Sequence, residues 1–149
     1  MWAVRRWVWC VSVATMLAAC ATLTPEQRAA RVQASTDQAC HLIGDYLTHR
    51  ASTGGTALWF AREKELEQQL RHKVDGVRAG DTAQHDAIAE YIKDTTRRVS
   101  EAELDAQYVD PNGRTRFQAM LAACDTLVPD VRLTALNARL VEEVKRRYG

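Results

Sequence analysis

Apolar residues after residue 24 recur every three to four positions, which is the spacing of amphipathic helices rather than of strands. A predicted helix over residues 56–78, for example, carries on one face the side chains Leu58, Leu66, Leu70, Val74 and Val77. Further helices are predicted over about residues 25–50, after residue 81, over residues 114–127 and after Pro129. The pattern therefore predicts an all-α fold, a small bundle of four to five amphipathic helices.

Capping residues mark the expected helix starts. The sequence Thr24-Pro25 predicts an N-cap followed by proline at the first helical position, and Asp81 is the expected cap of the third helix. The sequence Asp110-Pro111-Asn112-Gly113 predicts a turn. Residues 107–109 and 114–117 could pair across that turn as a short hairpin, an alternative to the helix over residues 114–127.

The first 24 residues differ in composition from the rest of the chain. They contain no Asp or Glu, and Arg5 and Arg6 stand near their start. Residues 7–19 then form a run of 13 residues without charge, within the roughly 7–15 of a signal-peptide core and shorter than the ~20 that span a bilayer. This composition predicts an export signal, with an uncleaved membrane anchor over residues 7–23 as the alternative.

The run ends in Leu17-Ala18-Ala19-Cys20, which resembles the lipobox of bacterial lipoproteins. The resemblance implies that Cys20 receives the lipid, that the signal is cleaved before it, and that the acylated cysteine anchors the protein in membrane lipid. Ala21, where an aspartate would favour the inner membrane, implies the outer membrane facing the periplasm. The expected organisation is a signal peptide over residues 1–19, a lipidated tether over 20–24 and a helical domain over 25–149.

The charge of the chain is nearly balanced. The formal net charge is +1, and residues 20–149 keep all 19 acidic but only 18 of the 20 basic residues, which leaves a charge of −1. A nucleic-acid-binding domain is strongly basic, so we expect no nucleic-acid partner.

Two cysteines remain in the domain once the signal and Cys20 are set aside. On helical wheels Cys124 lies at the centre of an apolar stripe and Cys40 at the edge of another, so both point inward. In an oxidising compartment this favours a Cys40–Cys124 disulfide. Two buried free thiols, or a redox or metal-binding role, are the alternatives.

No motif of catalytic or metal-binding chemistry stands out. His41, Asp45 and His49 carry zinc-ligand groups, but they lie on the helix face opposite the apolar stripe, where a solvated polar surface explains them. No serine sits in a nucleophile elbow, and no phosphate-binding glycine loop is present. We therefore expect no catalytic residue, no metal and no cofactor, although no single carboxylate can be chosen or dismissed as a catalytic group.

Two surface features are candidates for binding. Trp59 and Phe60 are adjacent aromatic residues beside Leu58, which the helical pattern places in the core. The basic run Lys145-Arg146-Arg147 either contacts anionic lipid or wall polymer, or balances the charge of a helix C-terminus. The expected function is that of a lipid-anchored binding, structural or accessory subunit of an envelope or secretion assembly, whose partner is an envelope protein or cell-wall polymer. The alternatives are a small periplasmic hydrolase or wall-modifying enzyme, and a periplasmic chaperone or inhibitor.

Overall fold

The computed structural model describes residues 22–97 and 111–149, apart from the side chains of residues 111 and 112. All regular elements in these ranges are helices: α2 (Pro25–Ala51), α3 (Ala57–Arg71), α4 (Val74–Arg78), α5 (Ala83–Thr96), α7 (Pro111–Leu127), the 3-10 helix η1 (Pro129–Val131) and α8 (Leu133–Tyr148). The predicted all-α class is confirmed. Within the same ranges, none of the helices combines the length and the apolar composition that crossing a membrane requires. The predicted signal peptide and Cys20 lie outside the described residues.

The chain divides into two compact units, residues 1–31 and 32–149, and α2 begins in the first of them. Its start is a capping box. Thr24 Oγ1 accepts a hydrogen bond from the Gln27 N–H at 3.2 Å, and Gln27 Oε1 accepts one from the Thr24 N–H at 3.0 Å. Pro25 occupies the first helical position, where its missing N–H costs no hydrogen bond. The helix start predicted from Thr24-Pro25 is confirmed.

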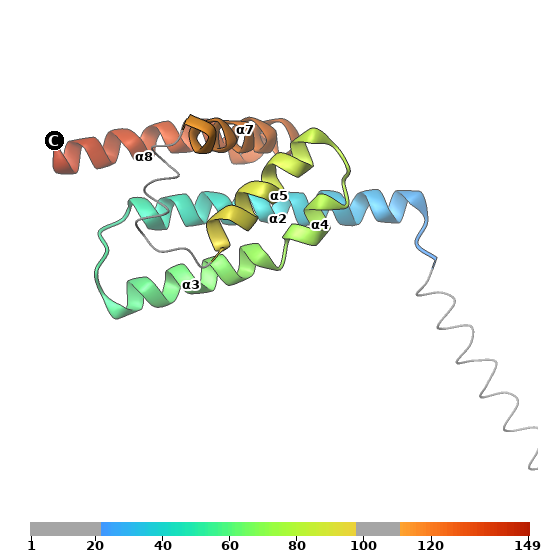
Figure 1. Ribbon diagram of the computed structural model, residues 1–149, viewed down its shortest axis with the longest axis horizontal. Coiled ribbons are helices and arrows are strands. Elements are labelled where there is room, and N and C mark those ends of the chain that lie inside the picture. The colour runs from blue at the N-terminus through green and yellow to red at the C-terminus, as the bar shows by residue number, and fades with distance from the viewer. Residues whose placement is uncertain (1–21, 98–110) are drawn as a thin grey trace, which may run out of the picture. The chain divides into compact units, whose positions relative to one another are not determined.

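In the second unit, α5 lies between α3 and α7 and also packs against α4, while α7 packs against α8 and η1 (Figure 1). The core takes fully buried side chains from each α-helix, including Ile43, Leu70, Val77, Ile92, Met120 and Leu133. Fully burying an aliphatic side chain of this size stabilises the fold by about 1.5–3 kcal/mol. The apolar stripes of the helices therefore meet in one core.

The helix predicted over residues 56–78 is interrupted in the structure. α3 ends at Arg71, and α4 begins at Val74 after a two-residue turn. The backbone at Gly76 then passes so close to α2 that a Cβ atom on this residue would overlap the Ser35 side chain. The prediction of one continuous helix is wrong because the break and the glycine together let α4 approach α2.

Helix α5 begins one residue later than the expected cap. Thr82, not Asp81, is the N-cap, and its Oγ1 accepts a hydrogen bond from the His85 N–H at 3.3 Å. Asp81 has φ 57°, in the left-handed region, which an N-cap with extended backbone does not adopt. The His85 side chain folds back over the same turn, with Nδ1 2.6 Å from Thr82 Oγ1. The prediction of Asp81 as the cap is therefore wrong.

The hairpin alternative is also wrong for its second strand, because residues 114–117 lie inside α7. This helix begins at Pro111, within the predicted turn, since proline is favoured at the first helical position. The first strand of that alternative, residues 107–109, lies outside the described residues.

The chain passes from α7 to α8 through η1 and Arg132, whose φ of 46° lies in the left-handed region. Because Arg132 provides no side-chain cap, the first N–H groups of α8 find an acceptor elsewhere. Asp125 of α7 supplies it, with Oδ1 accepting from the Leu133 N–H at 2.6 Å and Oδ2 from the Thr134 N–H at 3.3 Å. A carboxylate from one helix thus caps the next.

Candidate functional site

The two cysteines predicted to pair are joined in the structure. Cys40 of α2 and Cys124 of α7 have their sulfur atoms 2.18 Å apart and their Cα atoms 5.7 Å apart, and they are separated by 84 positions in the sequence. Both side chains are completely buried. Thiol–disulfide exchange requires access to the sulfur atoms, so this bond is a crosslink of the core rather than an exposed redox pair.

Trp59 closes the turn between α2 and α3. Its ring stacks on His49 with centroids 4.4 Å apart, and its Nε1–H donates to Ser52 Oγ at 2.9 Å. The His49 Nε2–H in turn donates to the Trp59 carbonyl at 3.0 Å. These contacts give Trp59 a structural role at the rim of the core. Because His49 contacts Trp59, it has a structural partner of its own, apart from His41 and Asp45.

Leu58 and Phe60 lie on either side of Trp59 and point to solvent, with 84% and 45% of their surfaces exposed. The expected core position of Leu58 is wrong. Thr56 is the N-cap of α3, so Leu58 belongs to the first turn, before the helix reaches the core residue Leu66. The surface therefore presents Leu58 and Phe60, whereas Trp59 is half-buried.

The basic run at the end of α8 is largely engaged within the protein. Lys145 Nζ pairs with Glu142 at 3.0 Å, and Arg147 Nη2 pairs with Glu143 at 3.1 Å. Arg147 Nη1 also donates to the carbonyl of Ala51, the last residue of α2, at 2.8 Å. This contact satisfies a carbonyl at a helix end, as a basic side chain commonly does.

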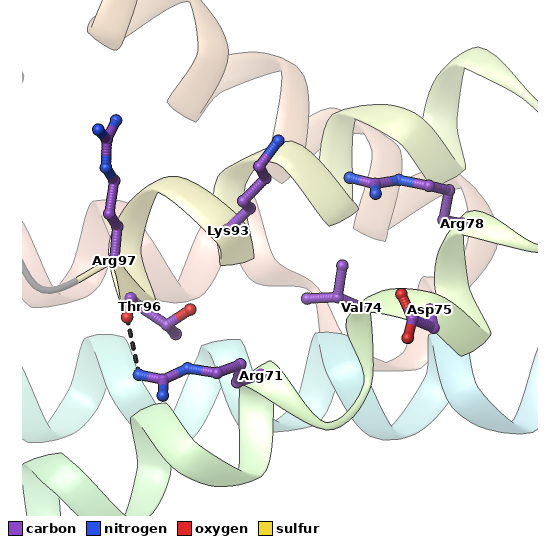
Figure 2. A pocket seen from close by; sticks show the side chains of 7 residues that line it. All are labelled: Arg71, Val74, Asp75, Arg78, Lys93, Thr96 and Arg97. Atoms are coloured by element: carbon purple, nitrogen blue, oxygen red, sulfur yellow. Dashed lines mark hydrogen bonds between the residues drawn. The ribbon is translucent and has the colours of Figure 1, made fainter.

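A pocket of about 540 Å³ opens where α3, α4 and α5 meet (Figure 2). Four of its lining side chains are basic, one is acidic, one is a hydroxyl and one is apolar: Arg71, Arg78, Lys93, Arg97, Asp75, Thr96 and Val74. We call this the basic pocket. Its lining charge contrasts with the nearly neutral charge of the chain as a whole.

Two of the basic side chains in this pocket have partners. Arg71 Nη2 donates to the Thr96 carbonyl at 2.8 Å, and Arg78 Nη2 pairs with Glu90 Oε1 at 3.0 Å. Within the described ranges, the side chains of Lys93 and Arg97 form no hydrogen bond or ion pair. Two cationic groups are therefore available to a ligand in the basic pocket.

None of the pocket residues is among those that the sequence suggested for binding. The basic side chains come from three helices, and only their packing brings them together. Local signals existed for two pairs: Lys93 and Arg97 are four residues apart, and Arg71 and Arg78 are seven apart, so each pair would share one face of a continuous helix.

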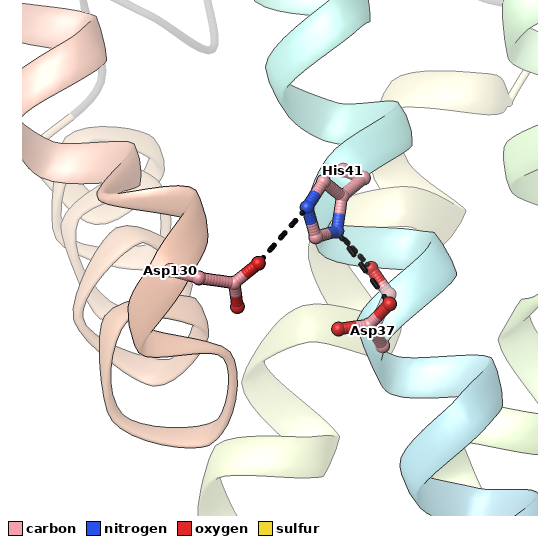
Figure 3. A group of neighbouring side chains, drawn as sticks. All are labelled: Asp37, His41 and Asp130. Atoms are coloured by element: carbon pink, nitrogen blue, oxygen red, sulfur yellow. Dashed lines mark hydrogen bonds and ion pairs between the residues drawn. The ribbon is translucent and has the colours of Figure 1, made fainter.

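A second polar cluster joins α2 to η1. His41 Nδ1–H donates to the Asp37 carbonyl at 2.8 Å, while Nε2 lies 3.4 Å from Asp130 Oδ2 (Figure 3). The Asp37 carboxylate is 3.7 Å from Nδ1. The structure thus places His41 with Asp37 and Asp130, rather than with His49.

These neighbours raise the pKa of His41 above its ordinary 6.5. The hydrogen bond to the Asp37 carbonyl has the largest effect, and the charges of Asp37, Asp130 and Asp45 add to it against a smaller opposing effect of burial. One ligand atom from each of His41, Asp37 and Asp130 lies within 4.8 Å of the others. Because each ring nitrogen of His41 faces a different aspartate, the cluster fits a protonated histidine between two carboxylates.

The Glu67 carboxyl group of α3 has a raised pKa. Burial raises the pKa of Glu67 above its ordinary value, and the neighbouring Glu63 raises it further, whereas Arg71 and Arg50 lower it. Glu63 itself is held by Arg50 at 2.6 Å. A carboxyl group with a raised pKa is a candidate proton donor, so Glu67 is one such candidate among the described residues.

Comparisons of this chain with protein-family models, with curated proteins and with solved structures found no match. The function is therefore inferred from the sequence signals and the described side chains.

Proposed function

We propose that the protein is a lipid-anchored cell-envelope protein that acts as a binding, structural or accessory subunit of an envelope or secretion assembly. Cys20 carries the lipid, and the helical domain faces the periplasm from the outer membrane. The observation that carries the proposal is the buried Cys40–Cys124 disulfide. Disulfides persist in oxidising compartments and are rare in the cytosol, so the bond agrees with the export signal.

A binding role is supported by what the described surface offers. Within residues 22–97 and 111–149, two cationic groups of the basic pocket, Lys93 and Arg97, have no hydrogen-bond or ion-pair partner. Leu58 and Phe60 are exposed apolar side chains on the first turn of α3. Binding requires only such presented groups, whereas catalysis requires a group poised against a reacting atom. The partners in this proposal are membrane lipid, through Cys20, and an envelope protein or cell-wall polymer.

The lipid anchor is tested by metabolic labelling with a fatty acid in a bacterial host. We expect the wild-type chain to incorporate the label and Cys20→Ala to lose it. Cys10→Ala is the matched control, because Cys10 lies in the expected signal peptide but outside the lipobox. Label retained in the Cys20→Ala variant, or lost equally from both variants, contradicts the proposal.

The subunit role is tested by crosslinking in intact cells, followed by recovery of the protein in detergent. We expect one envelope component to be recovered in a fixed ratio to the protein. A pattern of crosslinks that only follows the abundance of the neighbouring proteins contradicts a subunit role.

The alternative function, a small hydrolase or wall-modifying enzyme, is favoured by the raised pKa of Glu67. A carboxyl group that stays protonated at higher pH can act as a general acid. Turnover of cell-wall fragments that disappears in Glu67→Gln, but persists in the control Glu65→Gln, would favour this enzyme. Glu65 is suited to this purpose because it is exposed and pairs only with nearby polar side chains of α3.

A further inference from the structure

We propose that the basic pocket binds a ligand that carries a phosphate group on a polar body, such as a phosphorylated sugar or a phospholipid headgroup. This proposal names a class of ligand for the binding role proposed above. It rests on that proposed function only in assuming that the ligand comes from the cell envelope. The binding itself follows from the size and charge of the pocket.

The size of the pocket exceeds that of a single inorganic ion. Its volume of about 540 Å³ falls within the roughly 300–1,000 Å³ of small-molecule sites. Typical sites of this size are mainly apolar, but Val74 is the one apolar side chain among the described lining residues. A polar ligand with several hydrogen-bonding groups matches this lining.

The charge of the pocket selects an anion. Lys93 lies in the last turn of α5, Arg97 is the C-cap of that helix with extended backbone, and neither side chain has a partner within the described ranges. Arg71 is already oriented, because one of its Nη atoms donates to the Thr96 carbonyl. A guanidinium has five N–H donors, so Arg71 keeps donors for a ligand. Planar guanidinium groups match phosphate oxygens in pairs, and lysine adds a point charge.

The two sides of the pocket differ. Figure 2 shows Arg71 and Arg97 on one side of Val74, with Asp75 and Arg78 on the other. A carboxylate repels phosphate, and Arg78 is already paired with Glu90. The phosphate therefore belongs on the side of Arg71, Lys93 and Arg97. Figure 2 shows the charged ends of Lys93 and Arg97 pointing away from Arg71, so these two side chains have to turn toward a bound phosphate. Asp75 can accept hydrogen bonds from hydroxyl groups of the ligand.

A purely structural role is the competing explanation, because basic side chains stabilise helix C-termini. Arg71 has such a role through the Thr96 carbonyl. The side chains of Lys93 and Arg97 form no such hydrogen bond within the described ranges. If they only balance the helix dipole, their removal lowers the thermal midpoint and changes no binding.

The test uses the full chain purified in detergent, with calorimetric titration of inorganic pyrophosphate and of soluble short-chain phosphatidylglycerol or phosphatidylcholine. We expect pyrophosphate to bind, and each of Lys93→Gln and Arg97→Gln to weaken it about tenfold, since each removes a charge-assisted hydrogen bond. The matched controls Lys64→Gln and Arg139→Gln replace exposed basic residues outside the pocket and should leave affinity unchanged.

The phospholipids distinguish the sources of the phosphate. Phosphatidylglycerol that competes with pyrophosphate, when phosphatidylcholine does not, identifies a lipid headgroup; competition by neither identifies a soluble phosphate. Absent binding of all probes, or equal weakening in the pocket and control variants, overturns the proposal. So does a lower thermal midpoint with unchanged affinity in Lys93→Gln and Arg97→Gln. The titration in detergent measures ligand binding whether or not Cys20 carries a lipid. A failure of the ligand proposal can therefore be distinguished from a failure of the Cys20 labelling experiment.

Discussion

Removing the disulfide between Cys40 and Cys124 should destabilise the helical domain by a large fraction of its total stability. The bond closes a loop with a sequence separation of 84. For a loop of this length the chain-entropy relation gives a loss of about 4–5 kcal/mol, because the unlinked unfolded chain has many more conformations. Small domains unfold at a cost of about 5–15 kcal/mol in total. The reduced protein should therefore be close to the limit of stability.

The measurement is urea unfolding followed by circular dichroism, with and without a reducing agent. Reduction leaves both sulfur atoms in the core, so it isolates the crosslink from the packing. We expect the midpoint of the wild-type protein to fall by about 2–2.5 M urea on reduction, for a dependence of about 2 kcal/mol per M, the middle of the typical range. The Cys40→Ala/Cys124→Ala double variant should start at a low midpoint and not respond to the reducing agent.

A direct thiol count completes this experiment. Protein isolated without reduction and then unfolded should expose neither Cys40 nor Cys124 to a thiol reagent. Two reactive thiols, or a loss of less than about 1 kcal/mol on reduction, would refute the argument from loop entropy.

Three further predictions concern single side chains. Because the pKa of His41 is raised, the protonated form stabilises the fold. The stability of wild type relative to His41→Gln should be greatest below pH 6.5 and decline as the pH rises through the elevated pKa; a difference that does not change with pH would contradict this. Asp125→Ala removes the acceptor at the start of α8 and should lower the free energy of urea unfolding by about 1–2 kcal/mol. Asp125→Asn keeps an acceptor oxygen and should therefore keep most of that stability. Trp59→Ala should cost about 1–3 kcal/mol and Phe60→Ala less than about 1 kcal/mol. Trp59 is held by a ring stack on His49 and a hydrogen bond, whereas Phe60 is 45% exposed and meets the Trp59 ring edge-on; equal losses would contradict this.

The helices and much of the core could be predicted from the sequence because their signals are local. Ile88 and Ile92 repeat at helical spacing, and both are fully buried in α5. Cys124 lies at the centre of its predicted apolar stripe and is completely buried. Such residues face the core however the helices pack against one another. Their burial can therefore be predicted without knowing which helices they contact.

The features that the sequence did not predict depend on contacts between elements. Asp125 caps α8 across an intervening turn, and His41 meets Asp130 only because η1 lies beside α2. Leu58 fits the apolar period of its helix, but it precedes the part of α3 that reaches the core. The basic pocket is the largest such case, since its charges belong to three helices whose individual sequences show only ordinary polar faces.

The position of the disulfide also determines how the folded chain would carry a mechanical load. A force applied between the two ends of the domain passes from α2 through the bond into α7 and on to α8, because Cys40 and Cys124 lie on those helices. The segment between the two cysteines, which are 84 positions apart, includes α3, α4, α5 and the basic pocket and bears no tension while the bond is intact. Complete stretching of the oxidised protein would thus fall short of the reduced protein by about 280–300 Å, at roughly 3.3–3.6 Å per residue.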